Sequence, residues 1–384
     1  MEEQTVHAQK KRRKVAGWLK ILIAVVLTLS VSTGLWCALL GRSGLTMVET
    51  YLLARFAFVE ADADLDGATD AGLAAFVKGL GDRWSYYRSA ESYKTLTTTR
   101  ANNNVGVWIT VTYEREEGLL VQSVVLGGPA DKAGMVPGDI ITAVDGVSIA
   151  GDAREGAADK VLGDAGTQVT LTLLGEDGSV RDVTCARTRS ASGKMLEGGI
   201  GYVRLTNFYS GASENFRQEV DALVEQGARS LLVDVRSDPG GYVAELEKIL
   251  DYLLPEGPVF TQKPRWWGQT VYESDADCID LPMAVLVNRD SYSAAELLAA
   301  QLRESTGAPI VGEITSGKGY SQVTFPLLNG GGVGLSTATY CTGSGHSLIG
   351  EGIVPDVELS LEEGAAMGGE DDVQLQAAIE LLTQ

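Results

Sequence analysis

Ser293 and Lys318 could together support nucleophilic catalysis. Ser293 stands between a polar turn and a segment of strong helix formers, residues 294–303. Lys318 lies between two glycines, on the loop after the predicted strand 309–314. A serine hydroxyl needs a base to take its proton, and a lysine can be that base when desolvation or a neighbouring cation keeps its amine neutral. The pair therefore predicts a Ser/Lys nucleophilic site.

A competing interpretation of Ser293 is purely structural. Gln322 lies four residues after Lys318 and could hold its amine by a hydrogen bond, and a helix N-terminus favours an oxyanion. However, the run from Ser293 to Glu296 also matches the capping-box pattern, in which the serine stabilises the helix by about 1 kcal/mol without doing chemistry. Local spacing alone favours the cap.

Other hydrolytic sites need residues that this chain scarcely has. His7 and His346 are the only histidines, and His7 precedes the membrane segment predicted below. A single histidine without an aspartate partner disfavours a histidine-dependent triad, and the lack of an H-E-x-x-H motif disfavours a zinc hydrolase. Residues 62–67 resemble the start of a calcium loop, but its twelfth position is Leu73 rather than glutamate. We expect no metal and no other cofactor.

Length and charge limit the classes of function. The 384 residues suffice for two or three domains, and 45% hydrophobic with 21% charged residues is typical of globular proteins. The net charge is −20 and no basic face accumulates in the body of the chain, which argues against nucleic acid as a partner.

The N-terminus carries the pattern of a membrane anchor. Six lysines and arginines between residues 10 and 20 precede the uncharged run 21–40. About 20 apolar residues cross a ~30 Å hydrocarbon core, and the basic flank is expected in the cytoplasm. We therefore predict a cytoplasmic tail at 1–16, a transmembrane anchor at 17–40 and the rest of the chain outside the cell membrane.

A cleaved signal peptide is the alternative to this anchor. Residues 34–41 contain no small-x-small cleavage site, and the apolar run exceeds the usual signal core. A lipoprotein signal would need a small residue before Cys37, where Trp36 stands. The other three cysteines, Cys185, Cys278 and Cys341, match no metal spacing. A Cys278–Cys341 disulfide and buried free thiols are the two alternatives for them.

Beyond the anchor, the pattern of the sequence changes twice. Residues 44–100 show apolar side chains at roughly helical spacing. Residues 101–188 contain short alternating strands and many glycines. Residues 189–384 alternate predicted strands and helices, which favours an α/β core. Predicted strands there are 201–207, 230–235, 283–288, 309–314, 323–328 and 332–340, and predicted helices are 212–226, 242–253, 294–303 and 373–382.

A glycine turn follows the buried strand 230–235. Residues 234–241 read D-V-R-S-D-P-G-G, so a Pro-Gly-Gly turn would expose backbone N–H groups at a strand's carboxyl end. Functional sites of open α/β sheets lie at that edge. A turn that only needs positive φ is the alternative, because glycine adopts it at no steric cost.

The glycine-rich region resembles a PDZ domain. Residues 127–149 read GGPADKAGMVPGDIITAVDGVSI, and Val105, Gly106 and Val107 enter the first strand. The resemblance is to the circularly permuted form of bacterial proteases. It implies that backbone N–H groups of this loop bind the terminal carboxylate of a peptide, which then adds as a strand.

The chain from about residue 45 to its end resembles a C-terminal processing peptidase, also called a tail-specific protease. The motifs occur in the order of that family: the PDZ domain, D-x-R-x-x-P-G-G at 234–241, SYSAAE at 291–296, GKGYSQ at 317–322 and GEGIVPD at 350–356. The resemblance implies an α+β multidomain protein. Its parts would be the N-terminal transmembrane helix, a helical segment at 44–100, a β-barrel-like PDZ domain at 101–188 and an α/β peptidase core, similar to ClpP and crotonase, at 189–384.

Carried over by position, the resemblance assigns roles to particular residues. It makes Ser293 the nucleophile, Lys318 the general base and Gln322 the residue that orients Lys318. Backbone N–H groups of Ala294 and of Gly240 or Gly241 would form the oxyanion hole. Two positions depart from the family: Tyr292 where small residues are common, and Asp238 where asparagine is common. Neither departure removes a reacting group.

We therefore expect an anchored serine endopeptidase on the outer side of a bacterial cell membrane. Its PDZ domain would capture protein C-termini, and the resemblance implies that this domain gates the site and that the helical segment can form a homodimer. Two alternatives stay open. One is a catalytically silent PDZ scaffold that sequesters tails, and the other is a PDZ-bearing trypsin-like protease that would use His346.

Overall fold

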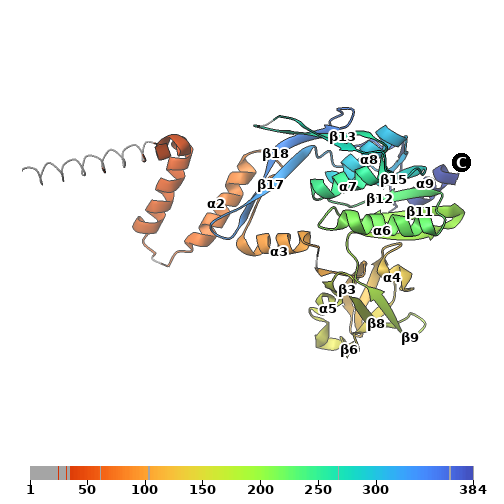
Figure 1. Cartoon of the computed structure of the whole chain (residues 1–384). Helices are drawn as coiled ribbons and strands as arrows, with labels where there is room; N and C mark the ends of the chain where they lie inside the picture. Colours follow the sequence, from red (N-terminus) through yellow and green to blue (C-terminus); the bar gives the residue numbers. More distant parts are fainter. Residues whose placement is uncertain are drawn as a thin grey trace, which may run out of the picture. The chain divides into compact units, whose positions relative to one another are not determined.

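The protein is represented by a computed structural model (Figure 1). It describes Val25, Ser32 and residues 35–60, 62–102, 104–266, 268–362 and 365–383. The chain divides into two compact units, Met1–Ala75 and Phe76–Gln384, and each is described by itself.

The first unit is mainly helical where it is described. Residues 35–57 form one helix, and α2 (Leu65–Gly79) begins after a turn and continues into the second unit. The predicted anchor at 17–40 lies outside the described residues apart from Val25, Ser32 and 35–40. In the part of the chain that is described, no helix has both the length and the apolar run needed to cross a membrane.

The prediction that residues 44–100 are helical is wrong at one place. β1 (Tyr86–Arg88) separates α2 from α3 (Ala90–Arg100) and pairs antiparallel with β18 (Gly332–Thr342). A three-residue strand is too short to leave a period in the sequence, and its partner is distant along the chain.

The region that resembles a PDZ domain forms a small antiparallel sheet with its own core, in which Leu119, Ile141 and Leu171 are fully buried. Its strands follow the order β3 (Ile109–Arg115), β4 (Gly118–Val124), β5 (Ile140–Val144), β8 (Gln168–Leu174) and β9 (Val180–Ala186). Shorter elements complete it: β2 (Asn104–Val105) with β7 (Gly163–Asp164), β6 (Val147–Ser148) beside β5, the helices α4 (Pro129–Lys132) and α5 (Ala157–Val161), and the 3₁₀ turn at Gly151–Arg154.

The remaining residues build an α/β core around a six-stranded sheet. Its order is β10 (Ala191–Leu196), β11 (Ile200–Leu205), β12 (Ser230–Asp234), β15 (Met283–Val287), β16 (Ile310–Gly312) and β19 (Val357–Glu358), and a 3₁₀ turn at Glu197–Gly199 joins the first two. Only β10 and β11 pair antiparallel. Every residue of β12 and β15 is buried, as expected for parallel strands covered on both faces.

Helices cover the two faces of this sheet. Val233 and Val285 pack on the side of α6 (Ala212–Glu225), α7 (Val243–Leu253) and α8 (Ala294–Thr306). Leu232 and Leu286 point the other way, toward α9 (Val373–Thr383). Because β12 and β15 run parallel, the loops that follow them reach the same edge of the sheet.

A second sheet brings Lys318 to that edge. It contains β1, β18, β13 (Gly257–Pro264) and β14 (Thr270–Ser274), with β17 (Tyr320–Pro326) paired to β18 (Figure 1). Lys318 lies just before β17. Among the described residues all four cysteines are free thiols, so the disulfide considered between Cys278 and Cys341 is not formed.

Candidate active site

Ser293 and Lys318 line the same pocket, with a volume of about 800 Å³. The two residues reach it from different directions, Ser293 from the start of α8 and Lys318 from the loop before β17. The pocket wall also contains the other predicted site residues of the core, namely Gly240, Gly241, Ala294 and Gln322. The structure thus brings together residues that stand up to 82 positions apart, from Gly240 to Gln322.

Ser293 has a strained backbone. Its φ is +64° and its ψ is −119°, a region that residues with a side chain rarely occupy. An ordinary N-cap residue is extended instead. The predicted capping box is present, and within it the Ser293 N–H donates to Glu296 Oε2 over 2.9 Å. Strain of this kind costs about 1–3 kcal/mol and clusters at functional sites, so the cap alone does not explain the conformation.

Lys318 faces aromatic rings rather than a carboxylate. Its Nζ lies 5.1 Å from the centroid of the Trp84 ring and 5.4 Å from that of Tyr292. Burial, together with the charge of Arg100, lowers the pKa of Lys318 to about 8, although Glu296 and Asp82 oppose the shift. A lysine in this state supplies a substantial neutral fraction near neutral pH, as a general base requires.

Glu296 connects the segments that carry Ser293 and Lys318. Its buried carboxylate accepts hydrogen bonds from Ser293 N–H (2.9 Å), Thr315 Oγ1 (2.6 Å), Gly317 N–H (2.7 Å) and Lys318 N–H (3.0 Å). Burial raises its pKa despite these four donors. The first turn of α8 and the lysine loop are therefore fixed to one side chain.

Gln322 lines the pocket, but its hydrogen bonds go elsewhere. Its Nε2 donates to Tyr320 O over 3.2 Å and to Ser336 Oγ over 3.1 Å. Among the described residues no hydrogen bond joins Gln322 to Lys318, or Lys318 Nζ to the Ser293 hydroxyl. The orienting role of Gln322 stays a prediction.

Two backbone N–H groups beside Ser293 are available for an oxyanion. The Gly240 N–H donates to Asp238 Oδ1 over 2.7 Å, so it is already used. The N–H groups of Gly241 and Ala294 donate to no acceptor among the described residues. Gly241 and Ala294 therefore have unused donors, and their oxyanion role stays a prediction.

Gly240 lets the glycine turn approach the serine closely. Its φ is +77°, and a Cβ at this position would lie 2.9 Å from Ser293 Cβ and 2.8 Å from the backbone N of Ala294. Such distances are shorter than van der Waals contact. Glycine is needed here both for the dihedral angle and for the space.

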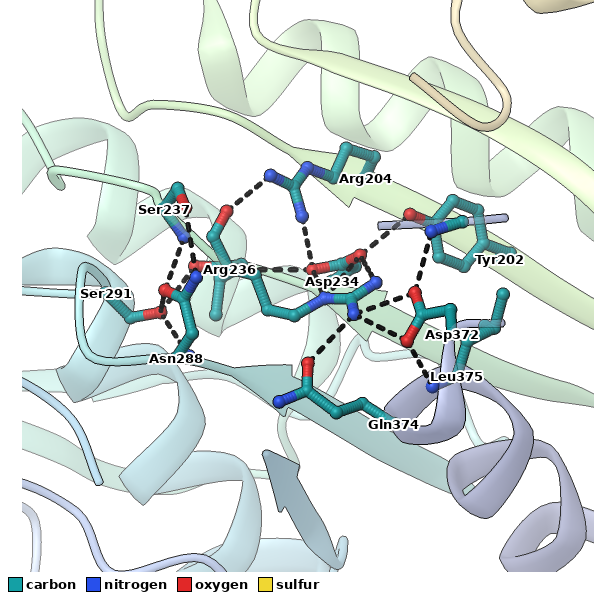
Figure 2. Close-up of polar contacts among 12 residues, drawn as sticks. Tyr202, Arg204, Asp234, Arg236, Ser237, Asn288, Ser291, Asp372, Gln374 and Leu375 are labelled. Atoms are coloured by element: carbon teal, nitrogen blue, oxygen red, sulfur yellow. Dashed lines mark hydrogen bonds and ion pairs between the residues drawn. The ribbon is translucent and has the colours of Figure 1, made fainter. Parts of the chain in front are cut away.

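A buried ionic network underlies the glycine turn (Figure 2). Asp234 Oδ1 accepts from Arg204 over 2.5 Å, and its Oδ2 accepts from Arg236 over 2.7 Å and from the Tyr202 hydroxyl over 2.8 Å. Burial alone would raise the pKa of Asp234, but the two guanidinium groups hold it well below its usual range. Arg236 continues the network to Asp372, at 2.8 Å, just before α9.

The same region joins the glycine turn to the serine segment. Ser291 Oγ donates to Val235 O over 2.8 Å, and the Ser237 N–H donates to Asn288 Oδ1 over 2.7 Å (Figure 2). The Tyr292 N–H also donates to Asp238 O over 3.1 Å. These bonds fix the loops after β12 and β15 relative to one another.

Asp238, the departure noted in the sequence, is fully buried. Its Oδ2 has no hydrogen-bond partner among the described residues, and burial raises its pKa well above the usual value.

The predicted peptide-binding loop of the PDZ domain begins at β2, where Val105 pairs with Gly163. Val105 and Val107 are buried, and the carbonyl groups of Gly106 and Val107 accept from Thr188 and Ala130. No described acceptor takes the N–H groups of Gly106 or Val107. Their role in binding a terminal carboxylate stays a prediction.

Sequence reasoning missed several residues of the pocket. Trp84 and Arg100 come from the segment predicted as simply helical, and Tyr340 comes from β18. The Tyr340 hydroxyl donates to the Lys318 carbonyl. Burial and the charge of Glu296 raise the pKa of Tyr340, whereas a hydrogen bond with the Ser293 hydroxyl opposes the shift. None of these residues stands in a recognisable motif.

Comparisons with known protein families agree with the motifs. The family model for peptidase family S41 matches residues 199–359, and the model for a PDZ domain matches residues 120–174. The carboxyl-terminal-processing protease of Synechocystis is 34% identical over 307 residues, which cover 76% of this chain and 72% of the relative. The carboxyl-terminal-processing protease of Picosynechococcus is 32% identical and covers 79% of this chain and 77% of its own length.

A solved structure shares the arrangement over most of its length. The photosystem II D1 C-terminal processing protease matches with a TM-score of 0.50 at 27% identity and covers 90% of this chain and 92% of its own. By sequence, the chain also resembles the carboxy-terminal processing protease CtpA of Bacillus subtilis. The two are 29% identical over 310 residues, which cover 79% of this chain and 66% of the relative.

Proposed function

The chain belongs to peptidase family S41, as a C-terminal processing serine peptidase, and on that premise we propose how and where it acts. It is an endopeptidase anchored in a bacterial cell membrane with its catalytic part outside the cytoplasm. Its PDZ domain binds the C-terminal tail of a protein, and a Ser293/Lys318 dyad cleaves a peptide bond nearby. The anchor rests on the basic flank and the apolar run at 21–40.

One observation carries the dyad assignment. Lys318 Nζ lies against two aromatic rings with a lowered pKa, in the same pocket as a serine held at a strained φ. A surface lysine with a structural role would keep its usual pKa and meet a carboxylate or water. The backbone of a serine that only caps a helix would be extended. Both residues depart from their ordinary state in the direction that catalysis needs.

The reaction follows from these positions. Neutral Lys318 accepts the proton of Ser293 Oγ while Oγ bonds to the scissile carbonyl carbon, and the oxyanion is stabilised by the Ala294 and Gly241 N–H groups. Protonated Lys318 then gives its proton to the leaving amine, which forms the acyl-enzyme. A water, deprotonated by the same lysine, hydrolyses the ester and restores Ser293. Lys318 reaches Oγ when substrate closes the pocket, since apo hydrogen bonds of such sites are often long.

Two variants of the full-length protein test the dyad. We expect Ser293→Ala and Lys318→Ala each to lower kcat for casein or a tailed peptide by at least about 10⁴-fold, because removing a nucleophile or its base removes the acyl-enzyme route. Ser347→Ala and Lys263→Ala, which change exposed residues outside the pocket, serve as matched controls and should keep full activity. Undiminished cleavage by either dyad variant would refute the assignment.

The same assay separates the two alternatives. A silent scaffold would bind tailed peptides without turnover under any condition. A trypsin-like mechanism would require His346, but this residue is exposed and does not line the pocket. We therefore expect His346→Ala to retain activity.

A further inference from the structure

The wall of the active-site pocket carries positive charge and no negative charge. Its charged lining residues are Arg83, Arg88, Arg100 and Lys318, and no aspartate or glutamate in the described part of the chain lines it. The chain as a whole has a net charge of −20, with 51 acidic and 31 basic residues excluding histidine. A purely cationic lining is therefore opposite to the character of the molecule.

The three arginines have no acidic partner. Among the described residues none of them forms an ion pair. Arg83 donates to Ser316 O over 2.6 Å and lies over the Trp84 ring, and Arg88 lies over the Tyr86 ring at 5.5 Å. The Nε of Arg100 is buried without any hydrogen-bond partner. Arg100 also lines the pocket, so the exposed part of its guanidinium, which has no acidic partner among the described residues, is available to a carboxylate of a ligand.

Arg100 is held close to the reacting residues. It ends α3, and its carbonyl accepts from the Ser210 N–H over 3.2 Å, which fixes the backbone beside the pocket. One face of α3, with Tyr93, Leu96 and Thr97, lines the same wall. Its charge is near enough to Lys318 to depress the pKa of the amine.

Two carboxylates outside the pocket, Asp82 and Glu296, act on the charge of Lys318 but form no ion pair with the arginines of this wall among the described residues. Asp82 accepts from the Trp84 N–H over 3.0 Å and from Ser85 Oγ over 2.5 Å. Glu296 is occupied by its four donors, and Asp238 is buried behind the glycine turn. Among the described residues, the charged side chains that line the pocket itself are therefore all cationic.

We propose that Arg100, supported by Arg88, forms a carboxylate-binding subsite in the active-site pocket. This inference rests on the proposed peptidase function and adds the substrate's chemistry to it. The subsite selects peptides that place an acidic side chain, or the free chain terminus, next to the scissile bond. Arginine suits this task because its planar fork binds a carboxylate through two hydrogen bonds.

The test begins with mapping where the full-length protein cuts casein, by mass spectrometry. Peptides spanning the preferred site are then made as pairs, with Glu or Gln at each flanking position, and as free acid or amide at a nearby C-terminus. We expect kcat/KM to favour Glu over Gln at one position, or free acid over amide, by about tenfold. A preference for Glu would show that the subsite binds an acidic side chain. A preference for the free acid would show that it binds the chain terminus.

Variants connect the preference to the arginines. Arg100→Gln should reduce it to about twofold or less, Arg88→Gln should weaken it, and Arg100→Lys should keep part of it as a point charge. Arg217→Gln, which removes a distant exposed arginine, should leave it unchanged. Cleavage of the neutral peptide, and its loss in Ser293→Ala, reports on the proposed function independently. Equal cleavage of all pairs by the unaltered protein, or a preference that survives in both Arg100→Gln and Arg88→Gln, would overturn the proposal.

Discussion

Lys318 owes its character to neighbours that are far away in the sequence. Its amine is buried beside the rings of Trp84 and Tyr292, and Arg100 adds a like charge. Burial and a like charge both disfavour an ammonium ion, so both lower the pKa. The same residue on an exposed loop would be almost fully protonated at pH 7. The environment therefore decides whether this lysine can act as a base.

This environment predicts the pH dependence of the peptidase. The neutral amine is the active form and the pKa of Lys318 is about 8, so kcat/KM for a neutral peptide should rise about tenfold per unit below pH 8 and level off above it. Arg100→Gln should move the midpoint upward, because a positive neighbour that favours the neutral amine is lost. Initial rates between pH 6 and 10 would measure both. A midpoint near 10 in the unaltered protein would contradict the role given to burial.

Glu296 shows how one side chain fixes two elements at once. Ser293 lies at the start of α8 and Lys318 lies in the loop before β17. The backbone N–H groups of both residues donate to the Glu296 carboxylate. All four of its partners are donors. A capping-box glutamate was predicted from the sequence as a local feature, but its bonds to Thr315 and to the lysine loop depend on tertiary structure.

We predict that Glu296→Gln impairs both stability and catalysis. A glutamine has one acceptor oxygen and would turn its NH₂ group toward a donor, leaving buried N–H groups unsatisfied. The expected loss of unfolding free energy is about 1–3 kcal/mol, with a fall in kcat of about 100-fold at unchanged fold. Urea unfolding and steady-state kinetics would measure these quantities. Glu225→Gln, at the exposed end of α6, is the control and should change neither by much. Full kcat in Glu296→Gln would show that the positioning role is wrong.

The elements of the core were predictable because their patterns are local. The buried strands β12 and β15 and the helices α6, α7 and α8 were predicted close to their observed bounds, since continuous apolar runs and helical periods mark them. β1 was missed because a three-residue strand has no period of its own. The pocket's aromatic and arginine wall was missed for a related reason: it is assembled from α3, β1 and β18, which meet only in the folded sheet.

At the scale of the whole molecule, the PDZ domain contacts the core through charged residues. Lys132, on α4, lies 3.0 Å from Glu219 on α6, and Lys194, on β10, lies 2.9 Å from Asp131 on α4. Each side thus supplies one lysine and one acid. The Lys132 and Lys194 side chains are 46% and 41% exposed, so each pair contributes at most about 1 kcal/mol. These ion pairs are thus a weak part of a contact that also includes hydrogen bonds of Ser192 with Lys132 and with the Gly127 carbonyl.

The two ion pairs of Lys132 and Lys194 predict how substrate recognition depends on salt and on these two lysines. Loss of one ion pair changes the equilibrium between the docked and undocked PDZ domain by up to about fivefold. Loss of both pairs changes it by up to about 25-fold. In Lys132→Gln with Lys194→Gln, tail binding should therefore no longer control the site, and the ratio of kcat/KM for a tailed peptide over its amidated form should approach one. Raising the ionic strength to about 0.5 M should shift the unaltered protein the same way, because exposed pairs are screened. Lys160→Gln, an exposed PDZ lysine outside these pairs, is the control. If the ratio of kcat/KM for the tailed peptide over its amidated form changes neither with salt nor with the double substitution, the two ion pairs do not couple the domains.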